Sequence, residues 1–386
     1  MKTYQHIESA LIHGGIYGDR QTGSVNTPIY QTSTYEQDGL GKLRSGWEYS
    51  RTGNPTRAAL EALIAELEEG SHGFAFASGM AAIDAVLHLF ASGDRILISS
   101  NVYGGTFRIL DKLMKPFGLS YTVVDTTDLA AVEASLTPEV KAVLVESPAN
   151  PLLTITDIQA LSVLTKAHGA LLIVDNTFMT PYLQRPLALG ADIVVHSATK
   201  YLGGHSDVIA GLAVVNAPVL AERLHFVQNA TGGILQPFDS YLLIRSIRTL
   251  ALRMDRHMEN AEQLAVLMRQ HEGIAQLYYP GLPDAQGHEI QLRQAKNGGA
   301  MISFELAEHY DLSRFFESLR LIALAESLGG VESLVCHPAT MTHASIPREI
   351  REQAGITDRL VRLSVGTENA ADIWDDLFSA LEEARG

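Results

Sequence analysis

The sequence predicts an α/β protein built on a mostly parallel β-sheet with helices on both faces. Short runs rich in Val, Ile and Leu alternate with helix-length amphipathic segments from about residue 56 onward. Most of these runs are continuously apolar, a pattern typical of strands that helices cover on both faces. Strands that alternate with helices in this way form βαβ units with parallel neighbours.

The elements of this fold can be placed in order along the chain. A first helix is predicted from Thr56, where aliphatic residues recur at three- and four-residue spacing before Gly70. Seven strands are then predicted, at Phe74–Ala77, Arg95–Ser99, Tyr121–Val124, Ala142–Glu146, Leu171–Val174, Ile193–Val195 and Leu212–Val215. Helical patterns between them lie near residues 80–91, 105–116, 128–136 and 157–168.

The two ends of the chain differ from this central region. Residues 1 to about 50 are rich in turn-forming residues and show no sustained periodicity, which predicts an extended arm. Residues 245–270 predict one long helix, followed by strands near 301–305 and 361–365 and a closing helix near 371–384. The expected organisation is an N-terminal arm (1–55), a large domain (56–245) and a small α+β domain (246–386).

The composition excludes several classes of protein. No apolar run approaches the ~20 residues that span a bilayer, and the first residues lack the apolar segment of a signal peptide, so we expect a cytoplasmic protein. A formal net charge of −15 argues against nucleic-acid binding. Cys336 is the single cysteine and the histidines show no metal-binding spacing, so we expect neither a disulfide nor a metal site.

Chemically useful residues follow the predicted strands, at the sheet edge where open α/β proteins bind ligands. Lys200 comes after the strand Ile193–Val195 and is either a surface lysine or a chemically used amine. Asp175 ends the aliphatic run Leu171–Val174, where a buried carboxylate is costly unless it is paired.

Three earlier strand ends add to this set. Ser78-Gly79-Met80 opens a helix whose N–H groups could hold a phosphate, although an ordinary helix cap explains it equally well. Tyr103 precedes two glycines and either presents a flat ring to a ligand or packs within its loop. Asn150 lies in a proline-rich turn after the strand Ala142–Glu146.

A lysine, an aspartate, an aromatic ring and a phosphate cup at one sheet edge match the needs of pyridoxal 5′-phosphate (PLP). Lys200 would form the Schiff base with the cofactor, and Asp175 would keep the pyridine nitrogen protonated. Tyr103 would stack on the ring. The helix N-terminus would take the phosphate, with Ser197 and Thr199 as hydroxyl donors.

Three other interpretations have less support. Ser197-Ala198-Thr199-Lys200 matches the S-x-x-K motif of serine β-lactamases, but the S-D-N and K-T-G motifs of that class do not follow it. No G-x-G-x-x-G follows the first predicted strand, which disfavours a nicotinamide enzyme. A binding protein without catalysis would require the strand-end residues to coincide by chance.

Several long segments resemble the Cys/Met-metabolism family of PLP-dependent trans-sulfuration enzymes. The resemblance runs from the arm to the C-terminal helix and implies the aspartate-aminotransferase-like fold (fold type I). The segments that carry it are EYSRTGNPT (48–56), ASGMAA (77–82), VYGGTFR (102–108), ESPANPLL (146–153), VDNTF (174–178), HSATKYLGGHSDVIAG (196–211), LAESLGGVESL (324–334), MTHASIP (341–347) and RLSVGTE (362–368).

The resemblance implies a role for each matching residue of the cofactor site. Lys200 would be the Schiff-base lysine and proton shuttle, Asp175 would hold the pyridine nitrogen, and Tyr103 would stack on the ring and transfer protons. The phosphate would be bound by Gly79, Met80, Ser197 and Thr199. Tyr49 and Arg51 would reach the phosphate of a neighbouring subunit, since the family forms homotetramers with shared active sites.

The resemblance also implies how the substrate is held. Arg362 would clamp the α-carboxylate of an amino-acid substrate, helped by Asn150 and the Ser327 backbone. Glu326 and Glu48 match carboxylates near the distal end of cystathionine, although both acids could equally be ordinary exposed residues.

The activity within the family is narrowed but not decided by these residues. Gly105 stands where methionine γ-lyases usually have a cysteine, which disfavours that activity. We expect α,γ-elimination of L-cystathionine, and release of hydrogen sulfide from homocysteine stays open as a side activity. The main alternative is cystathionine γ-synthase, which joins an O-acyl homoserine to cysteine, and cystathionine β-lyase remains a further one.

Overall fold

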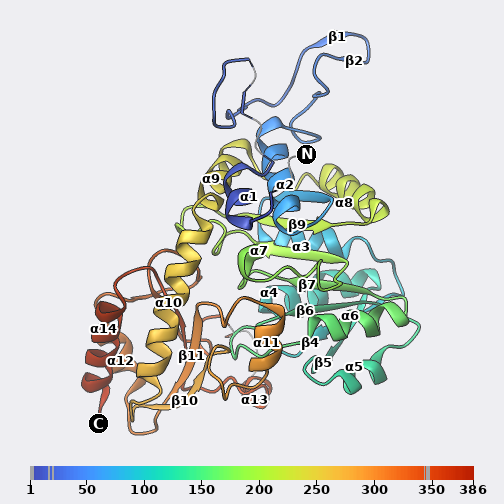
Figure 1. Cartoon of the computed structure of the whole chain (residues 1–386). Coiled ribbons are helices and arrows are strands. Elements are labelled where there is room, and N and C mark those ends of the chain that lie inside the picture. Colours follow the sequence, from blue (N-terminus) through green and yellow to red (C-terminus); the bar gives the residue numbers. More distant parts are fainter. Residues whose placement is uncertain (1–3, 16–17, 20, 343, 345–347) are drawn as a thin grey trace.

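The computed structural model of the 386-residue chain describes residues 4–15, 18–19, 21–342, 344 and 348–386. Part of the MTHASIP segment therefore lies outside the described residues. Figure 1 shows an N-terminal arm, a large sheet with its helices, and a smaller sheet beside a long helix. None of the described helices is long and apolar enough to cross a membrane.

The N-terminal arm is extended over most of its length. Residues 21–49 are mostly exposed and reach away from the rest of the chain, with a short hairpin at the tip formed by β1 (Gln37–Gly39) and β2 (Lys42–Leu43) (Figure 1). The expectation of no regular structure before residue 50 was wrong for α1 (Ile7–His13). This helix buries Ala10 and Leu11 beside α2, and its two turns are too short to give a clear period.

The large sheet contains all seven predicted strands, each within two residues of its predicted ends. Its strand order is β3-β9-β8-β7-β6-β4-β5. The strands from β8 to β5 are parallel, whereas β9 runs antiparallel to β8 and β3. The strands are β3 (His72–Phe76), β4 (Arg95–Ser99), β5 (Ser120–Val124), β6 (Val140–Glu146), β7 (Leu171–Asp175), β8 (Ile193–Ser197) and β9 (Gly211–Val215).

Helices cover both faces of this sheet, so alternate residues of a strand enter two separate cores. In β6, Val143 and Val145 belong to one core, and Ala142 and Leu144 belong to the other. Because both faces of a central strand are buried, its consecutive residues are mostly apolar rather than alternately apolar and polar. The helices of this region are α2 (Pro55–Leu67), α3 (Gly79–Leu87), α4 (Gly104–Arg108), α5 (Leu129–Ser135), α6 (Ile158–Ala167), α7 (Thr180–Leu183) and α8 (Pro218–Thr231).

Two helical predictions needed correction. The segment near 105–116 is α4 followed by a π-helical turn (Ile109–Met114) and a 3₁₀ turn (Lys115–Phe117). The long helix predicted over 245–270 is two helices, α9 (Pro237–Ile247) and α10 (Leu250–Met268). Between them the Thr249 hydroxyl and the Arg253 guanidinium donate to the Ser246 carbonyl, so side chains compete with the helical ladder there.

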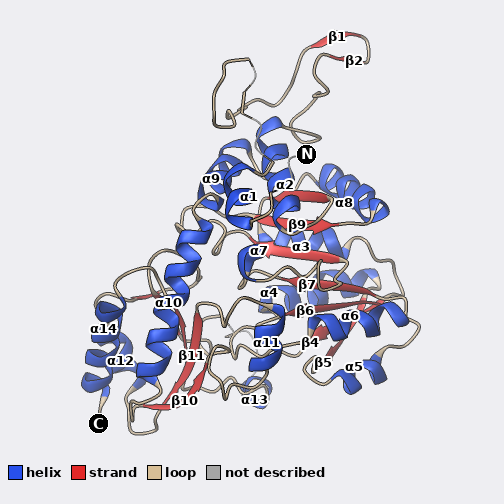
Figure 2. Cartoon of the chain, viewed as in Figure 1, coloured by secondary structure: helices blue, strands red, loops and turns tan. Residues whose placement is uncertain are grey.

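The second sheet has five strands in the order β10-β11-β14-β13-β12, beside α10 (Figure 2). Only β11 (Met301–Leu306) and β14 (Leu360–Ser364) were predicted, since β12 (Ala323–Leu324) and β13 (Leu334–Cys336) are too short for a pattern and β10 (Ile274–Tyr278) is an edge strand. The remaining helices are α11 (His288–Gln294), α12 (Leu312–Ser318), α13 (Arg348–Gln353) and α14 (Ala370–Ala384).

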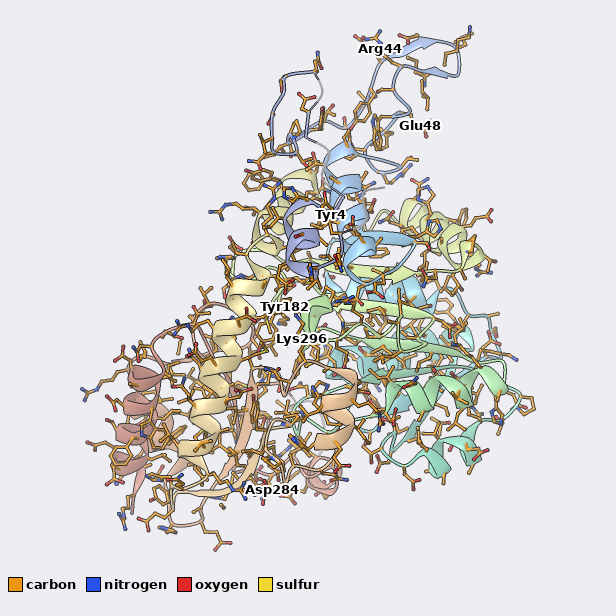
Figure 3. All side chains as sticks on the ribbon, in the orientation of Figure 1. Tyr4, Arg44, Glu48, Tyr182, Asp284 and Lys296 are labelled. Atoms are coloured by element: carbon orange, nitrogen blue, oxygen red, sulfur yellow. The ribbon has the colours of Figure 1, made fainter. Side chains whose placement is uncertain are left out.

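The two sheets lie within residues 72–215 and 274–364, and we keep 1–55, 56–245 and 246–386 as the proposed arm and domains. A polar cluster joins the two larger regions. The Lys296 ammonium lies 3.6 Å from the centre of the Tyr182 ring, and the Tyr182 hydroxyl donates to Asp255 at 2.8 Å. Figure 3 shows Tyr182 and Lys296 side by side.

Candidate active site

A cavity of about 280 Å³ lies at the carboxyl ends of β6, β7 and β8, where residues of the small sheet region close over the large sheet. Most of the predicted site residues line it, although they come from distant parts of the chain. They are Gly79, Met80, Tyr103, Asn150, Asp175, Ser197, Thr199, Lys200, Glu326, Ser327 and Arg362.

The three predicted arm residues lie elsewhere. Glu48, Tyr49 and Arg51 do not line this cavity, and all three are exposed. Figure 3 shows Glu48 on the arm, well above the large sheet. The Arg51 guanidinium lies over the Tyr49 ring, 5.6 Å from its centre. Their role at the site of a neighbouring subunit therefore stays a prediction.

Lys200 places its amine inside the cavity. Its Nζ donates a hydrogen bond to the Ser327 hydroxyl at 2.7 Å. Burial and the nearby positive charge of Arg362 lower the pKa of Lys200 to about 8, and the negative charge of Glu326 opposes this shift. Because the pKa is lowered, the neutral amine is far more populated near neutral pH than in an exposed lysine.

Asp175 ends β7 and lines the cavity. The Thr177 N–H donates to Asp175 Oδ1 at 3.0 Å, and the Thr177 hydroxyl bonds the same oxygen. Burial raises the pKa of Asp175, while the bonds from Thr177 and the neighbouring His196 act in the opposite direction. A carboxylate in such a place is strongly stabilised by a cationic partner.

Small residues shape the opposite wall. Ser78 caps α3 by accepting the Ala81 N–H, so α3 starts at Gly79 with first-turn N–H groups that have no intrahelical acceptor. A Cβ at Gly79 would lie 2.9 Å from Ser197 Cβ, so a glycine is required for this close approach. A Cβ at Gly105 would lie 2.7 Å from Met80 Sδ and would collide with Tyr103 Cε1.

Arg362, on β14, is held from two sides. Its Nη1 donates to Asn150 Oδ1 and its Nη2 to the Ser327 carbonyl, both at 2.9 Å. Ser327 has φ of 87°, an unusual value for a residue with a side chain. The Arg362 Nε is buried and has no partner among the described residues. This fixed guanidinium can receive a carboxylate.

Two predicted residues line the cavity in a different way from the others. Thr199 lines the cavity, but its hydroxyl donates to the Ala210 carbonyl at 3.3 Å and accepts the Ala210 N–H at 3.1 Å. Glu326 lies exposed at the cavity rim. Both residues still line the cavity, and their roles in binding stay predictions.

Sequence reasoning missed two residues. Thr177 bonds Asp175 through its hydroxyl and also accepts the Ser197 N–H at 2.8 Å. Glu146 lines the cavity and accepts the Tyr103 N–H at 2.6 Å. Glu146 ends the strand β6 in the way that Asp175 ends β7, so the rule about strand ends could have found it.

The residues present fit PLP. The Asp175 carboxylate can hold a pyridinium, the start of α3 can hold a phosphate, and the Lys200 amine can attach a carbonyl carbon. The glycine at position 79 lets the start of α3 lie directly against Ser197 at this wall of the cavity. The site is therefore suited to this cofactor on its own geometry.

Comparison with known proteins agrees with this chemistry. The family model described as "Cys/Met metabolism PLP-dependent enzyme" matches residues 8–382. Cystathionine beta-lyase of Lactococcus lactis subsp. cremoris is 55% identical over 98% of this chain and 99% of its own. Cystathionine gamma-lyase of Bacillus subtilis strain 168 is 53% identical over 97% of this chain and 99% of its own.

Among solved structures, the crystal structure of cystathionine gamma-lyase from Lactobacillus plantarum complexed with L-serine is similar, with a TM-score of 0.96 and 53% identity. The similarity covers 98% of this chain and 99% of that one. Because the sequence match and the structural likeness both run almost from end to end, this chain belongs to the Cys/Met metabolism family of PLP-dependent enzymes.

Proposed function

We propose that this enzyme is a cystathionine γ-lyase, which converts L-cystathionine and water to L-cysteine, 2-oxobutanoate and ammonia. The observation that carries the proposal is the placement of Lys200. Its amine, with a pKa of about 8, lies in a cavity that also contains Arg362 and Glu326. A base (Lys200), a cation that can bind a carboxylate (Arg362) and an acidic group that can bind an ammonium (Glu326) suit a substrate with two amino and two carboxylate groups.

Substrate recognition follows from the two charged ends of this cavity. The guanidinium of Arg362, held by Asn150 and Ser327, binds the α-carboxylate. The carboxylate of Glu326 at the rim attracts the distal ammonium group of cystathionine. Methionine has no such ammonium group, so the same carboxylate disfavours it. Glu48 of a neighbouring subunit adds a second acid in this proposal.

The chain supplies the proton transfers. PLP, when bound, supplies an electron sink for the charge that develops at the substrate Cα. Asp175 would keep the ring nitrogen protonated, and Tyr103, which lines the same cavity, would face the cofactor ring. Lys200 would remove the Cα proton and give it up to the electron sink that the cofactor supplies, and the amine, neutral again, would then remove a Cβ proton, while Ser327 orients its Nζ. Tyr103 transfers a proton to the sulfur that leaves Cγ.

Two other reactions use the same residues. β-Elimination of L-cystathionine with water yields homocysteine, pyruvate and ammonia, and a relative named cystathionine beta-lyase is 55% identical to this chain, against 53% for the relatives named gamma-lyase. γ-Replacement joins an O-acyl homoserine to cysteine and releases the acyl acid. The γ-lyase is favoured because the relative from B. subtilis and the solved structure from L. plantarum both have that name.

The deciding experiment separates the keto acids. Purified holoenzyme is given L-cystathionine, and 2-oxobutanoate and pyruvate are quantified by chromatography. A parallel reaction contains O-acetyl- or O-succinylhomoserine with cysteine and is analysed for cystathionine. Predominant 2-oxobutanoate supports the γ-lyase, predominant pyruvate replaces it with the β-lyase, and faster net synthesis replaces it with the γ-synthase. Lys200→Ala should abolish every one of these reactions.

We also propose that the protein is a homotetramer with active sites shared between subunits. The support is the arm, along which several large apolar side chains are exposed, namely Val25, Ile29, Tyr30, Leu40, Leu43 and Tyr49. Such side chains on an extended segment are typical of a surface that a second copy covers. Sedimentation velocity should give a mass four times that of the 41.9 kDa chain.

A further inference from the structure

Glu146 is a buried acid at the centre of the site to which neither the motifs nor the mechanism above assigns a role. It is the last residue of β6, pairs in register with Asp175 at the end of β7, and is 7% exposed. Residues paired in register on parallel strands point to the same face of the sheet, about 5 Å apart along the hydrogen-bond direction. Both carboxyl groups therefore face the same cavity.

The Glu146 carboxyl group contacts two segments that carry functional side chains. It accepts the Tyr103 N–H at 2.6 Å, at the first residue before α4. A hydrogen bond from the Asn150 N–H also stabilises its charged form. Asn150 in turn holds Arg362. The Glu146 side chain thus connects the backbone at Tyr103 with the Asn150 turn, which supports Arg362.

Its charge state depends on its surroundings. Burial and the negative charge of Asp175 raise the pKa of Glu146 to about 8. The other titratable or charged groups that line this cavity are Tyr103 just before α4, His196 and Lys200 from β8 and the turn after it, and Glu326 and Arg362 from the small sheet region. A cation placed at Asp175 would favour the ionised form of Glu146.

We propose that Glu146 is a positioning residue of this active site: it fixes Tyr103 and the Asn150 turn through their backbone N–H groups and acts electrostatically on Asp175. The inference rests on the site proposed above, but it holds for any reaction of this family. Because a pyridinium bound at Asp175 attracts the Glu146 carboxylate, cofactor binding near neutral pH should release a proton from Glu146.

The test compares Glu146→Gln and Glu146→Ala with Glu133→Gln, an exposed control on α5. Visible circular dichroism of the bound cofactor reports the position of the ring and its neighbours. Calorimetry of cofactor binding at pH 7, in two buffers with different ionisation enthalpies, counts the protons released. Far-ultraviolet circular dichroism and thermal unfolding verify that each variant is folded.

Glu146→Gln keeps an acceptor oxygen, so it should retain the visible signal but release up to about one proton fewer than the wild type. Glu146→Ala loses the acceptor, so its visible signal should fall by at least about half and kcat/KM about 100-fold, because Tyr103 moves. Glu133→Gln should match the wild type in both.

Three results would overturn the proposal. These are a wild-type visible signal in Glu146→Ala, equal proton release by the wild type and Glu146→Gln, or equal loss of signal in the two Glu146 variants. The visible signal and the proton release require only bound cofactor, so the absence of cystathionine cleavage by the wild type would contradict the proposed function and leave this inference standing.

Discussion

At the residue scale, Lys200 shows how a buried environment prepares an amine for chemistry. The same burial that lowers its pKa makes the charged form costly. Ser327 and Arg362 lie beside Lys200 although they are more than 120 residues away in the sequence. The hydrogen bond from Lys200 Nζ to Ser327 spans 127 positions. Two predictions follow from this one group.

The first concerns the rate at which PLP attaches to the cofactor-free protein. Only the neutral amine attacks a carbonyl, so the rate should rise about tenfold per pH unit below pH 8 and level off above it. The rate is measured from the growth of visible absorbance between pH 6 and pH 10. A rise that continues unchanged to pH 10 would show that the pKa of Lys200 has its ordinary value.

The second concerns stability without the cofactor. The pKa of Lys200 is lower in the folded than in the unfolded chain, so the unfolded chain binds more protons between about pH 8 and 10.5. The destabilisation is therefore complete below pH 8 and disappears as the pH rises to 10.5. Lys200→Met should raise the free energy of unfolding at pH 7 by about 3 kcal/mol.

Urea denaturation at pH 7 and at pH 10.5 tests this second prediction. The difference between Lys200→Met and the wild type should shrink at the higher pH. An equal gain at both values would attribute the effect to packing of the methionine side chain, and no gain at pH 7 would contradict the burial argument.

At the scale of elements, parallel strands determine which residues meet. The ends of β6, β7 and β8 are adjacent in the sheet, so the strand order alone places Glu146, Asp175 and the turn carrying Lys200 next to one another. Helices α3 and α4 then start at this edge. Their first residues, Gly79 and Gly104, follow directly on the residues that face the cavity.

Helix α4 offers a matched pair of glycines for a test. A Cβ at Gly105 would collide with the Tyr103 ring, whereas a Cβ at Gly104 would lie 3.5 Å from the Thr342 carbonyl oxygen, an ordinary contact. Gly105→Ala should therefore displace the Tyr103 ring and lower kcat/KM by about 10–100-fold. Gly104→Ala should stay within about twofold of the wild type, since alanine also favours the helix.

Steady-state kinetics and the visible circular dichroism of the bound cofactor measure both effects. If Gly105→Ala keeps the wild-type spectrum and rate, Met80 has moved instead and Tyr103 is not confined by this glycine. Equal losses in the two variants would show that α4 itself, rather than the Tyr103 ring, is sensitive to substitution.

At the scale of the whole molecule, two regions outside the large sheet carry predicted site residues: the small sheet region and the arm. The small sheet region brings Glu326, Ser327 and Arg362 to the cavity. Tyr49 and Arg51, at the end of the arm, are exposed and do not line this cavity. The shared site between two subunits that we propose would account for both facts.

A mixing experiment tests shared sites directly. Lys200→Ala and Arg51→Ala homo-oligomers should each have strongly reduced activity. After unfolding and refolding together in equal amounts, half of the dimers are hybrids, and one site of each hybrid has an intact lysine and an intact arginine. Activity should therefore return to about a quarter of the wild-type value.

The control is the same mixture without unfolding, which should stay inactive if subunits do not exchange. Activity of the refolded mixture that equals the mean of the two variants would mean that each site is built from a single chain. In that case Arg51 has no part in the site of a neighbour.

The sequence predicted the large sheet well because its evidence is local. Most of its strands are continuous apolar runs, which is the pattern expected of strands buried on both faces. The strand-end residues Asp175 and Lys200 were identified for the same reason, since the edge of a parallel sheet follows from the order of its elements. Local patterns failed where an element was short, as in α1, β12 and β13.

What the sequence by itself determined was the fold class, the family resemblance and the set of residues at the sheet edge. Only the tertiary structure decided how they meet. Arg362 bonds Asn150 across 212 positions, and Glu146 acquires its role from Asp175 and Tyr103, which lie on other elements. Hydrophobic periodicity specifies which face of an element is buried. Contacts between polar groups depend instead on how the sheet and the small region pack, and no local pattern contains that information.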